Sequence, residues 1–259
     1  MASSSETFWD HLEVLRGTLL RIGAAVLGVS IVAFVCKDAL FKIILWPTRP
    51  DFPLWKLLDH WQPADPFESI TLINTDLAQQ FIVHMQTALA VGALIVSPYI
   101  LYELLRFLMP ALYPHERRRA LPAAALGFLL FWSGLAVSYW LIFPFTFRFL
   151  GTYQVADQIC NYINLSSYTS TLLILCLLMG LLFELPVLCR LLAGIGLLTS
   201  QPMKRYRKHA IVAIFVLAAV ITPTGDAFTL CLVALPICML YEISILSVSR
   251  IEKRSNPEK

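Results

Sequence analysis

Apolar runs long enough to cross a lipid bilayer recur along nearly the whole chain. A transmembrane helix needs about 20 mostly apolar residues to span a hydrocarbon core of roughly 30 Å. Charged residues make up only 14% of the chain, well below the roughly 25% of soluble domains. Hydrophobicity predicts six spans, at residues 22–36, 81–109, 120–147, 168–192, 210–221 and 228–248. The sequence therefore predicts an all-α integral membrane protein with a single membrane domain over residues 1–259.

The positively charged residues indicate how the spans are oriented. Of the 20 Lys and Arg residues, 15 fall at the termini and in the even-numbered loops, and five fall in the others. The positive-inside rule places the richer side in the cytoplasm. Both termini, the loop with Glu116 and the loop from Lys204 to Lys208 are therefore expected there, in agreement with an even number of spans.

Three segments outside the spans carry further patterns. Residues 1–21 have apolar side chains at helical spacing, with Ser3 and Glu6 in a capping-box pattern, and predict an amphipathic helix at the cytoplasmic interface. The long loop at residues 37–80 alternates prolines with aromatic residues and predicts a structured external cap. Residues 249–259 are expected to form a cytoplasmic tail, and no cleavable signal is expected at the start of the chain.

The fifth predicted span is unusually short. Between His209 and Thr222 it has about twelve apolar residues, roughly 18 Å of helix. A tight turn, Thr222 to Asp226, joins it to the sixth span. We expect local thinning of the bilayer, although misplaced helix ends would also explain the pattern.

Intramembrane and interfacial acids are the first candidates for function. Glu184 lies well inside the fourth span, where an ionisable residue costs about 2.5–3.5 kcal/mol or more, and Pro186 should loosen the helix beside it. The alternative is a buried, protonated glutamic acid that only bonds a neighbouring helix. Glu103 and Glu242, near cytoplasmic helix ends, favour structural pairing, and Asp226 fits an N-cap as well as a functional role.

The chain has no sequence pattern typical of an enzyme or a metal site. HExxH, Walker and GxSxG motifs are missing, the six cysteines have no zinc-like spacing, and His84 has no second ligand at metal spacing. We therefore predict no catalytic residue, no cofactor and no metal, and the modest net charge of +3 gives no sign of nucleic-acid binding.

The loop between the second and third spans combines an acid, an aromatic ring and three arginines. In FLMPALYPHERRR, Glu116 precedes Arg117 directly, and Phe107 stands before Pro110. The arginines alone could serve to fix topology. A rigid aromatic ring with a carboxylate, however, is suited to hold a guanidinium by cation–π and bidentate contacts.

Four motifs in order resemble those of the TatC family, the multi-spanning subunit of the twin-arginine protein translocase. HLEVLR resembles the family's HLxELR, FLMPALYPHERR its FxxPALYxxERR, FELP its FExP, and TPTGD with the segment after it the TPxxD turn and last span. The resemblance implies a receptor for signal peptides of folded precursors that carry two adjacent arginines. It also implies short fifth and sixth spans and single-span partner subunits of the TatA/TatB type, and it allows a homo-oligomer. A bacterial inner membrane is expected rather than a thylakoid-type membrane, because the start of the chain does not resemble a transit peptide.

The resemblance assigns roles to individual residues. The expected signal-peptide residues are Phe107, Glu116, Glu13, Arg16, Glu103, Pro110, Leu112 and Arg117. The residues expected to serve partner subunits or translocation are Glu184, Pro186, Asp226 and Pro47.

Departures from the family pattern leave one role open. Val14 stands where HLxELR has its acid, and Glu13 is one residue earlier, about 100° round the helix. Leu105 and Leu230 replace a usual Trp and a frequent Gln. The alternative function is a small proton-coupled transporter, for which an intramembrane carboxylate and broken helices are also typical.

Overall fold

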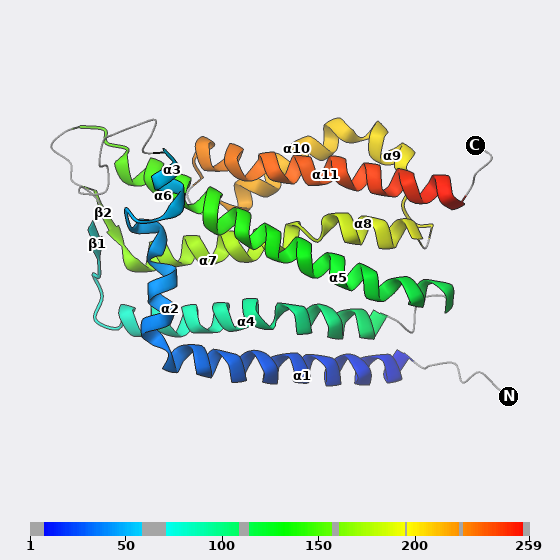
Figure 1. Cartoon of the computed structure of the whole chain (residues 1–259), viewed down its shortest axis with the longest axis horizontal. Helices are drawn as coiled ribbons and strands as arrows, with labels where there is room; N and C mark the ends of the chain where they lie inside the picture. The colour runs from blue at the N-terminus through cyan, green and yellow to red at the C-terminus, as the bar shows by residue number, and fades with distance from the viewer. Residues whose placement is uncertain are drawn as a thin grey trace.

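The structure, a computed structural model, describes residues 8–58, 71–108, 114–156, 161–194, 196–222 and 225–255. Long helices run side by side along one axis, and a two-stranded sheet gathers at one end of the bundle with the short helices of residues 37–58 and 143–152 (Figure 1). The predominantly helical fold expected from the sequence is confirmed.

The elements follow one another along the chain without a separate soluble unit among the described residues. The N-terminal half holds α1 (Phe8–Val35), α2 (Lys37–Ile44), η1 (Trp46–Thr48), α3 (Pro53–Leu58), β1 (Thr71–Ile73), α4 (Gln79–Leu108) and α5 (Pro114–Val137). The C-terminal half holds the π-helical turn η4 (Ser138–Ile142), α6 (Phe143–Thr152), β2 (Tyr162–Asn164), α7 (Leu165–Leu182), α8 (Leu185–Gly194), α9 (Ser200–Arg205), α10 (Arg207–Ile221) and α11 (Ala227–Ser255).

Five stretches within the described residues are long and apolar enough to cross a membrane. They are Leu12–Val35, Gln79–Leu104, Ala125–Thr152, Leu165–Gly194 and Ala227–Glu252. Each overlaps one of the six predicted spans. The remaining prediction, the short fifth span, corresponds to α10, whose 15 residues give about 22 Å of helix.

The sixth predicted span is not short, and that expectation is wrong. Helix α11 has 29 residues and continues past Val248 to Ser255. Its last turns are held by α9, because Met203 packs against Val248 and the Glu252 carboxylate accepts hydrogen bonds from the backbone N and the hydroxyl of Ser200. These contacts stabilise the last turns of α11, where the hydropathy of the sequence falls and no longer predicts a span.

The first helix is also longer than expected. Helix α1 runs without a break from Phe8 to Val35, so the described part of residues 1–21 is not a helix separate from the first span. In its first half, Leu12, Val14, Leu19 and Leu20 are exposed. Ser3 and Glu6, the predicted capping box, lie outside the described residues.

Helices α1 and α4 form an antiparallel pair along one side of the bundle (Figure 1). They are in close contact where Gly92 of α4 faces Ser30 of α1: a Cβ atom on Gly92 would lie 2.2 Å from the Ser30 Oγ. Small residues permit such close backbone approach between membrane helices, where dispersion contacts replace the hydrophobic effect as the main driving force. The glycine therefore sets how near the two helices can come.

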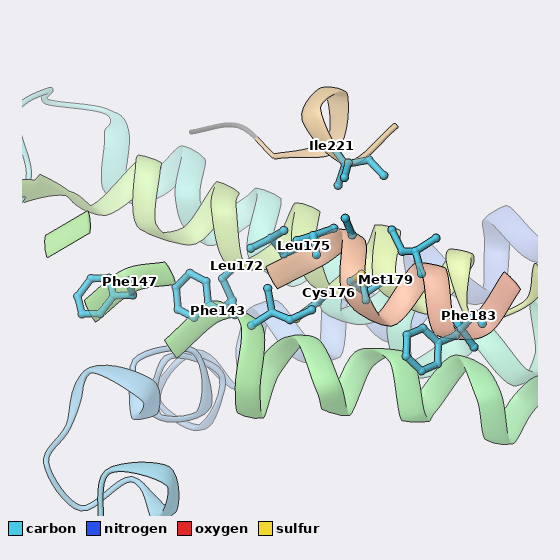
Figure 2. Close-up of a cluster of buried hydrophobic side chains, with 14 of the residues drawn as sticks. Phe143, Phe147, Leu172, Leu175, Cys176, Met179, Phe183 and Ile221 are labelled. Atoms are coloured by element: carbon cyan, nitrogen blue, oxygen red, sulfur yellow. The ribbon is translucent and has the colours of Figure 1, made fainter. Parts of the chain in front are cut away.

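The main apolar core surrounds α7. Buried side chains from η4, α6, α7, α10 and α11 meet there, and Figure 2 labels eight of them, namely Phe143, Phe147, Leu172, Leu175, Cys176, Met179, Phe183 and Ile221. Of the five candidate spans, the one containing α7 has the largest buried share, 56%. Two glycines allow α5 and α7 to touch, because Gly134 lies against Met179 and Phe183, and Gly180 lies against the Phe131 ring.

The described parts of the loop at residues 37–80 are folded onto the bundle, so the prediction of a structured cap is confirmed for them. Phe52 is fully buried and stacks on Trp140, with ring centroids 5.2 Å apart. The hydroxyl groups of Tyr139 and Tyr168 donate hydrogen bonds to the carbonyls of Ile43 and Ile44, at 2.6 and 2.8 Å. These carbonyls lie in the last turn of α2, where no backbone donor follows within the helix.

A short parallel sheet ties the same loop to the segment before α7. Strand β1 pairs with β2 through Leu72 opposite Ile163. Beyond the strands, the side chain of Asn164 accepts from Gln79 and donates to Thr75, at 2.5 and 2.8 Å. The start of α4 and the start of α7 are thereby held together at this end of the bundle.

Candidate functional site

Three segments named as candidates from the sequence meet at one end of the bundle. The start of α1, the end of α4 and the start of α5 all lie at the end opposite the cap (Figure 1). Helix α4 contacts both α1 and α5. The structure therefore brings the start of the first helix and the two helix ends that flank the FLMPALYPHERR loop to the same end of the bundle.

The aromatic and acidic residues of the loop sit on helix ends. Phe107 lies in the last turn of α4 and is half-buried. Glu116 and Arg117 are the third and fourth residues of α5, whose first residue is a proline, a residue favoured at that position. Pro110 and Leu112 lie outside the described residues.

The two candidates from the first helix are open to the surroundings. Glu13 and Arg16 are both exposed on α1. Val14, which stands at the family's acidic position, is 52% exposed. The part of Glu13 and Arg16 in a common site with Phe107 stays a prediction.

Glu103, one turn before Phe107 on α4, is engaged in an ion pair. Its carboxylate accepts from the Nε and a terminal nitrogen of Arg21 on α1, at 3.2 and 2.8 Å. Tyr99 donates its hydroxyl to the other carboxylate oxygen at 3.2 Å, and Arg106 lies 3.9 Å from that oxygen. The prediction of structural pairing for Glu103 is confirmed.

Glu242 pairs in the same way at the other edge of this end. Arg207, the first residue of α10, forms an ion pair with Glu242 of α11. Both side chains are about half-exposed, so the pair contributes little to stability. It links the start of α10 to α11, which agrees with the structural role expected for Glu242.

Glu184 lies at a break between two helices. Helix α7 ends at Leu182 and α8 begins at Leu185. Pro186 is the cause, because a proline has no N–H to donate to the carbonyl four residues earlier. The backbone instead closes a tighter turn, in which the amide of Glu184 donates to the Leu181 carbonyl at 3.1 Å. The predicted loosening of the helix is confirmed.

The Glu184 side chain is buried against α5. A Cβ atom on Gly127 would lie 2.8 Å from the Glu184 Oε2, so the glycine leaves the room that the carboxyl group occupies. The Oε1 atom of Glu184 is buried and has no hydrogen-bond partner among the described residues. A buried polar group without a partner is costly, which marks Glu184 as a place where another polar group would be favourable.

Asp226 and Pro47 lie at the cap end of the bundle. The Asp226 Oδ1 accepts from the backbone N of Thr229 at 2.7 Å, which confirms the predicted N-cap of α11. Pro47 is buried in η1, and its carbonyl accepts from the Trp55 indole at 3.1 Å. The structure therefore separates these two candidates from Glu13, Phe107 and Glu103 by the length of the bundle.

Histidine and cysteine side chains do not gather into a metal site in the described part of the chain. Groups of three or more His, Cys, Asp or Glu side chains are not found there. His84 instead stacks on Phe34, with ring centroids 4.0 Å apart and planes within 9°. This packing places His84 between the end of α1 and the start of α4.

Sequence reasoning missed the partners of the acids. Arg21 was counted only as a charge that orients the first span, and Gly127 was not singled out. The spacing of Thr18 and Arg21, one turn apart on α1, could have indicated a shared helix face, since the Arg21 guanidinium also donates to the Thr18 hydroxyl at 3.0 Å. Glu103, the partner of Arg21, is 82 residues away in the sequence, so no local sequence pattern could have indicated this contact.

Known proteins match the chain over most of its length. The family model described as Sec-independent protein translocase protein (TatC) matches residues 10–236. Proteins of that name from Azotobacter chroococcum and Aquifex aeolicus are 30% and 32% identical, over 95% and 91% of this chain and 91% and 92% of their own. The TatCy protein of Bacillus subtilis is 35% identical over 92% of this chain and 86% of its own.

A solved structure agrees with the fold as a whole. The crystal structure named as the twin-arginine translocase receptor TatC superposes with a TM-score of 0.76 at 32% identity, covering 93% of this chain and 98% of that one. The family model, the relatives and the fold therefore agree with the five apolar helices in indicating a membrane protein of this family. The chain belongs to the TatC family of Sec-independent protein translocase proteins and is a multi-pass membrane protein of protein transport.

Proposed function

We propose that this chain is the receptor and a core component of a twin-arginine protein translocase in a bacterial inner membrane. It binds the Arg-Arg signal peptides of folded precursors on the cytoplasmic side and assembles with single-span TatA/TatB-type subunits. The observation that carries the proposal is the meeting of the start of α1, the end of α4 and the start of α5 at one end of the bundle, in a chain of this family.

The proposed topology has six spans with both termini in the cytoplasm. Helix α1 begins and helix α11 finishes at the same end of the bundle, where α9 and the start of α5 also lie (Figure 1). The positive-inside rule assigns that end to the cytoplasm. Helix α10 supplies the sixth crossing. Its length of about 22 Å is several ångströms short of the bilayer core, so the membrane thins around it at fractions of a kcal/mol per Å.

Recognition rests on Phe107 and Glu116. The half-buried ring of Phe107 is fixed on a helix, and Glu116 lies in the first turn of α5. One arginine lies against the ring and the other pairs with the carboxylate. Arginine is preferred to lysine because a planar guanidinium binds a carboxylate through two bonds and stacks on an aromatic face, whereas an ammonium is a point charge.

The loop alone cannot account for strong binding. An exposed carboxylate–guanidinium pair contributes about 0–1 kcal/mol, whereas micromolar affinity requires about 8 kcal/mol. The apolar segment of the signal peptide supplies the remainder, at about 0.8 kcal/mol per buried CH2 group. Specificity therefore comes from the loop, and most of the affinity comes from the membrane-embedded surface.

Glu184 is the proposed contact for a partner subunit. Its buried Oε1 has no hydrogen-bond partner among the described residues, and the break at Pro186 opens backbone groups beside it. A polar side chain from a single-span partner would satisfy this carboxyl group within the membrane. The family resemblance, which assigns Glu184 to this role, supports the same assignment.

Photocrosslinking of a twin-arginine signal peptide to the chain tests the proposal. We expect Phe107→Ala and Glu116→Gln each to reduce crosslinking, and a twin-lysine peptide to crosslink poorly to the unchanged protein. The matched control is Asp38→Asn, which removes one exposed acid from α2 at the cap end and should leave crosslinking intact. Full crosslinking in both loop variants would refute the proposed site.

A further inference from the structure

The ion pair between Arg21 and Glu103 is unusually enclosed for a charged contact between two apolar helices. The Glu103 side chain is only 3% exposed, whereas Arg21 is 48% exposed. Two nitrogens of one guanidinium bind one carboxylate oxygen, and the Thr18 hydroxyl accepts from the same guanidinium. One α1 side chain thus holds α4 at a fixed height and rotation.

The pair lies directly below the proposed recognition residue. Glu103 and Phe107 are four residues apart on α4, so they project from the same face one turn apart. The Arg21 side chain leans back along α1, with its NH1 atom 3.6 Å from where a Cβ atom on Gly17 would lie. Because α1 and α4 are antiparallel, this lean carries the guanidinium toward the end of α4 that bears Phe107.

Glu103 is poorly accessible to an incoming arginine, because its side chain is only 3% exposed. Arg21 uses one carboxylate oxygen, and Tyr99 and Arg106 face the other at 3.2 and 3.9 Å. Arg21 and Arg106 already place two positive charges beside the carboxylate. A second guanidinium would meet repulsion there and is directed to Glu116 instead.

We infer that the Arg21–Glu103 pair, with Tyr99 and Thr18, is a latch between α1 and α4 that positions Phe107 for the signal peptide. Glu103 is then a positioning residue. It does not contact the signal peptide directly, contrary to what the family resemblance led us to expect. Charged pairs in low-dielectric surroundings specify one arrangement of helices because any other leaves a charge unpaired. A rotation of α4 by one residue, about 100°, would carry Phe107 away from its face.

The inference rests on the proposed function, so its test needs two separate readouts. The variants are Arg21→Glu, Glu103→Arg, the two together, and the milder Arg21→Lys, with Arg190→Gln as a control that removes an exposed arginine from α8. The first readout is crosslinking of a twin-arginine signal peptide. The second is the distance distribution between spin labels at positions 20 and 104, both exposed on α1 and α4, in a background without native cysteines.

We expect each charge reversal to broaden the distance distribution and to lower crosslinking about tenfold, and the combined swap to restore both. Arg21→Lys should give values between those of the unchanged protein and the charge reversals, because lysine keeps the positive charge but loses the second hydrogen bond to Glu103. Arg190→Gln should match the unchanged protein.

Three results would overturn the latch: an unchanged distance distribution in the single variants, unchanged crosslinking where the distribution has broadened, or a swap that restores the distances but not crosslinking. The third would mean that Glu103 itself touches the peptide. Failure of the proposed function would give a different result. Phe107→Ala and Glu116→Gln would then leave crosslinking intact, while the spin-label distances would still change in the Arg21 and Glu103 variants.

Discussion

Replacing Gly134 by alanine should force α5 and α7 apart beside Glu184. An added Cβ atom would lie 2.6 Å from the Met179 carbonyl oxygen and 2.7 Å from the Phe183 Cγ. The Met179 oxygen cannot move without cost, because it accepts a hydrogen bond from the Phe183 amide at 3.0 Å at the end of α7. The Phe183 Cγ cannot move far either, because it lies next to the backbone. The whole helix must shift.

The magnitude follows from two opposing effects. Overpacking costs about 1–3 kcal/mol, and contacts this short with backbone point to the upper end. Alanine gains up to about 1 kcal/mol over glycine in a helix. The net loss expected for Gly134→Ala is therefore about 2 kcal/mol. Gly28→Ala on α1 is the control, since nothing lies within 4 Å of its added Cβ atom and only the helix gain remains.

Unfolding in mixed dodecylmaltoside and SDS micelles, followed by tryptophan fluorescence, would measure the difference. We expect Gly134→Ala to unfold at lower SDS fraction than the unchanged protein, and Gly28→Ala at an equal or higher one. Since Phe183 precedes Glu184 directly, Gly134→Ala should also weaken association with single-span partner subunits. Equal unfolding of the two alanine variants would refute the close packing of α5 on α7.

Three further changes give outcomes that the same unfolding assay can check. Asp226→Ala removes the cap of α11 and should cost about 1 kcal/mol, whereas Asp226→Asn should retain stability because asparagine caps equally well; equal losses would exclude the capping role. Tyr168→Phe removes the bond to the Ile44 carbonyl and should cost about 0.5–1.5 kcal/mol, so an unchanged midpoint would contradict that bond. Glu242→Gln breaks the exposed pair with Arg207 and should change stability by less than about 1 kcal/mol; a larger loss would show that the pair is shielded from water.

Local patterns predicted the elements that depend on local chemistry. The continuous apolar run over residues 81–109 was enough to place α4, and Pro186 was enough to place the break after α7, because a missing backbone donor has the same effect in any fold. Asp226 likewise caps α11 as its position before an apolar run predicts. Each of these features is decided within a few residues.

Features decided by distant contacts were predicted only in part. The paired state of Glu103 followed from its place at a helix end, but its partner Arg21 could not be found, since the contact joins residues 82 apart. Helix α11 was ended too early at Val248 because hydropathy does not register Met203, which packs there from another helix. Helix α1 was divided at Ile22 because its first turns mix charge with leucines, although an unbroken helix accommodates both.

The weak enclosure of α1 bears on how the protein is made. Only 11% of its apolar stretch is buried, and its main helical contact is with α4, which leaves the ribosome later, after residues 36–78. During that interval α1 must reside in lipid without a companion, and its mean hydropathy of 2.1 over Leu12–Val35 suits independent insertion. The first helix thus serves as an anchor for the nascent chain before it becomes half of the α1–α4 pair.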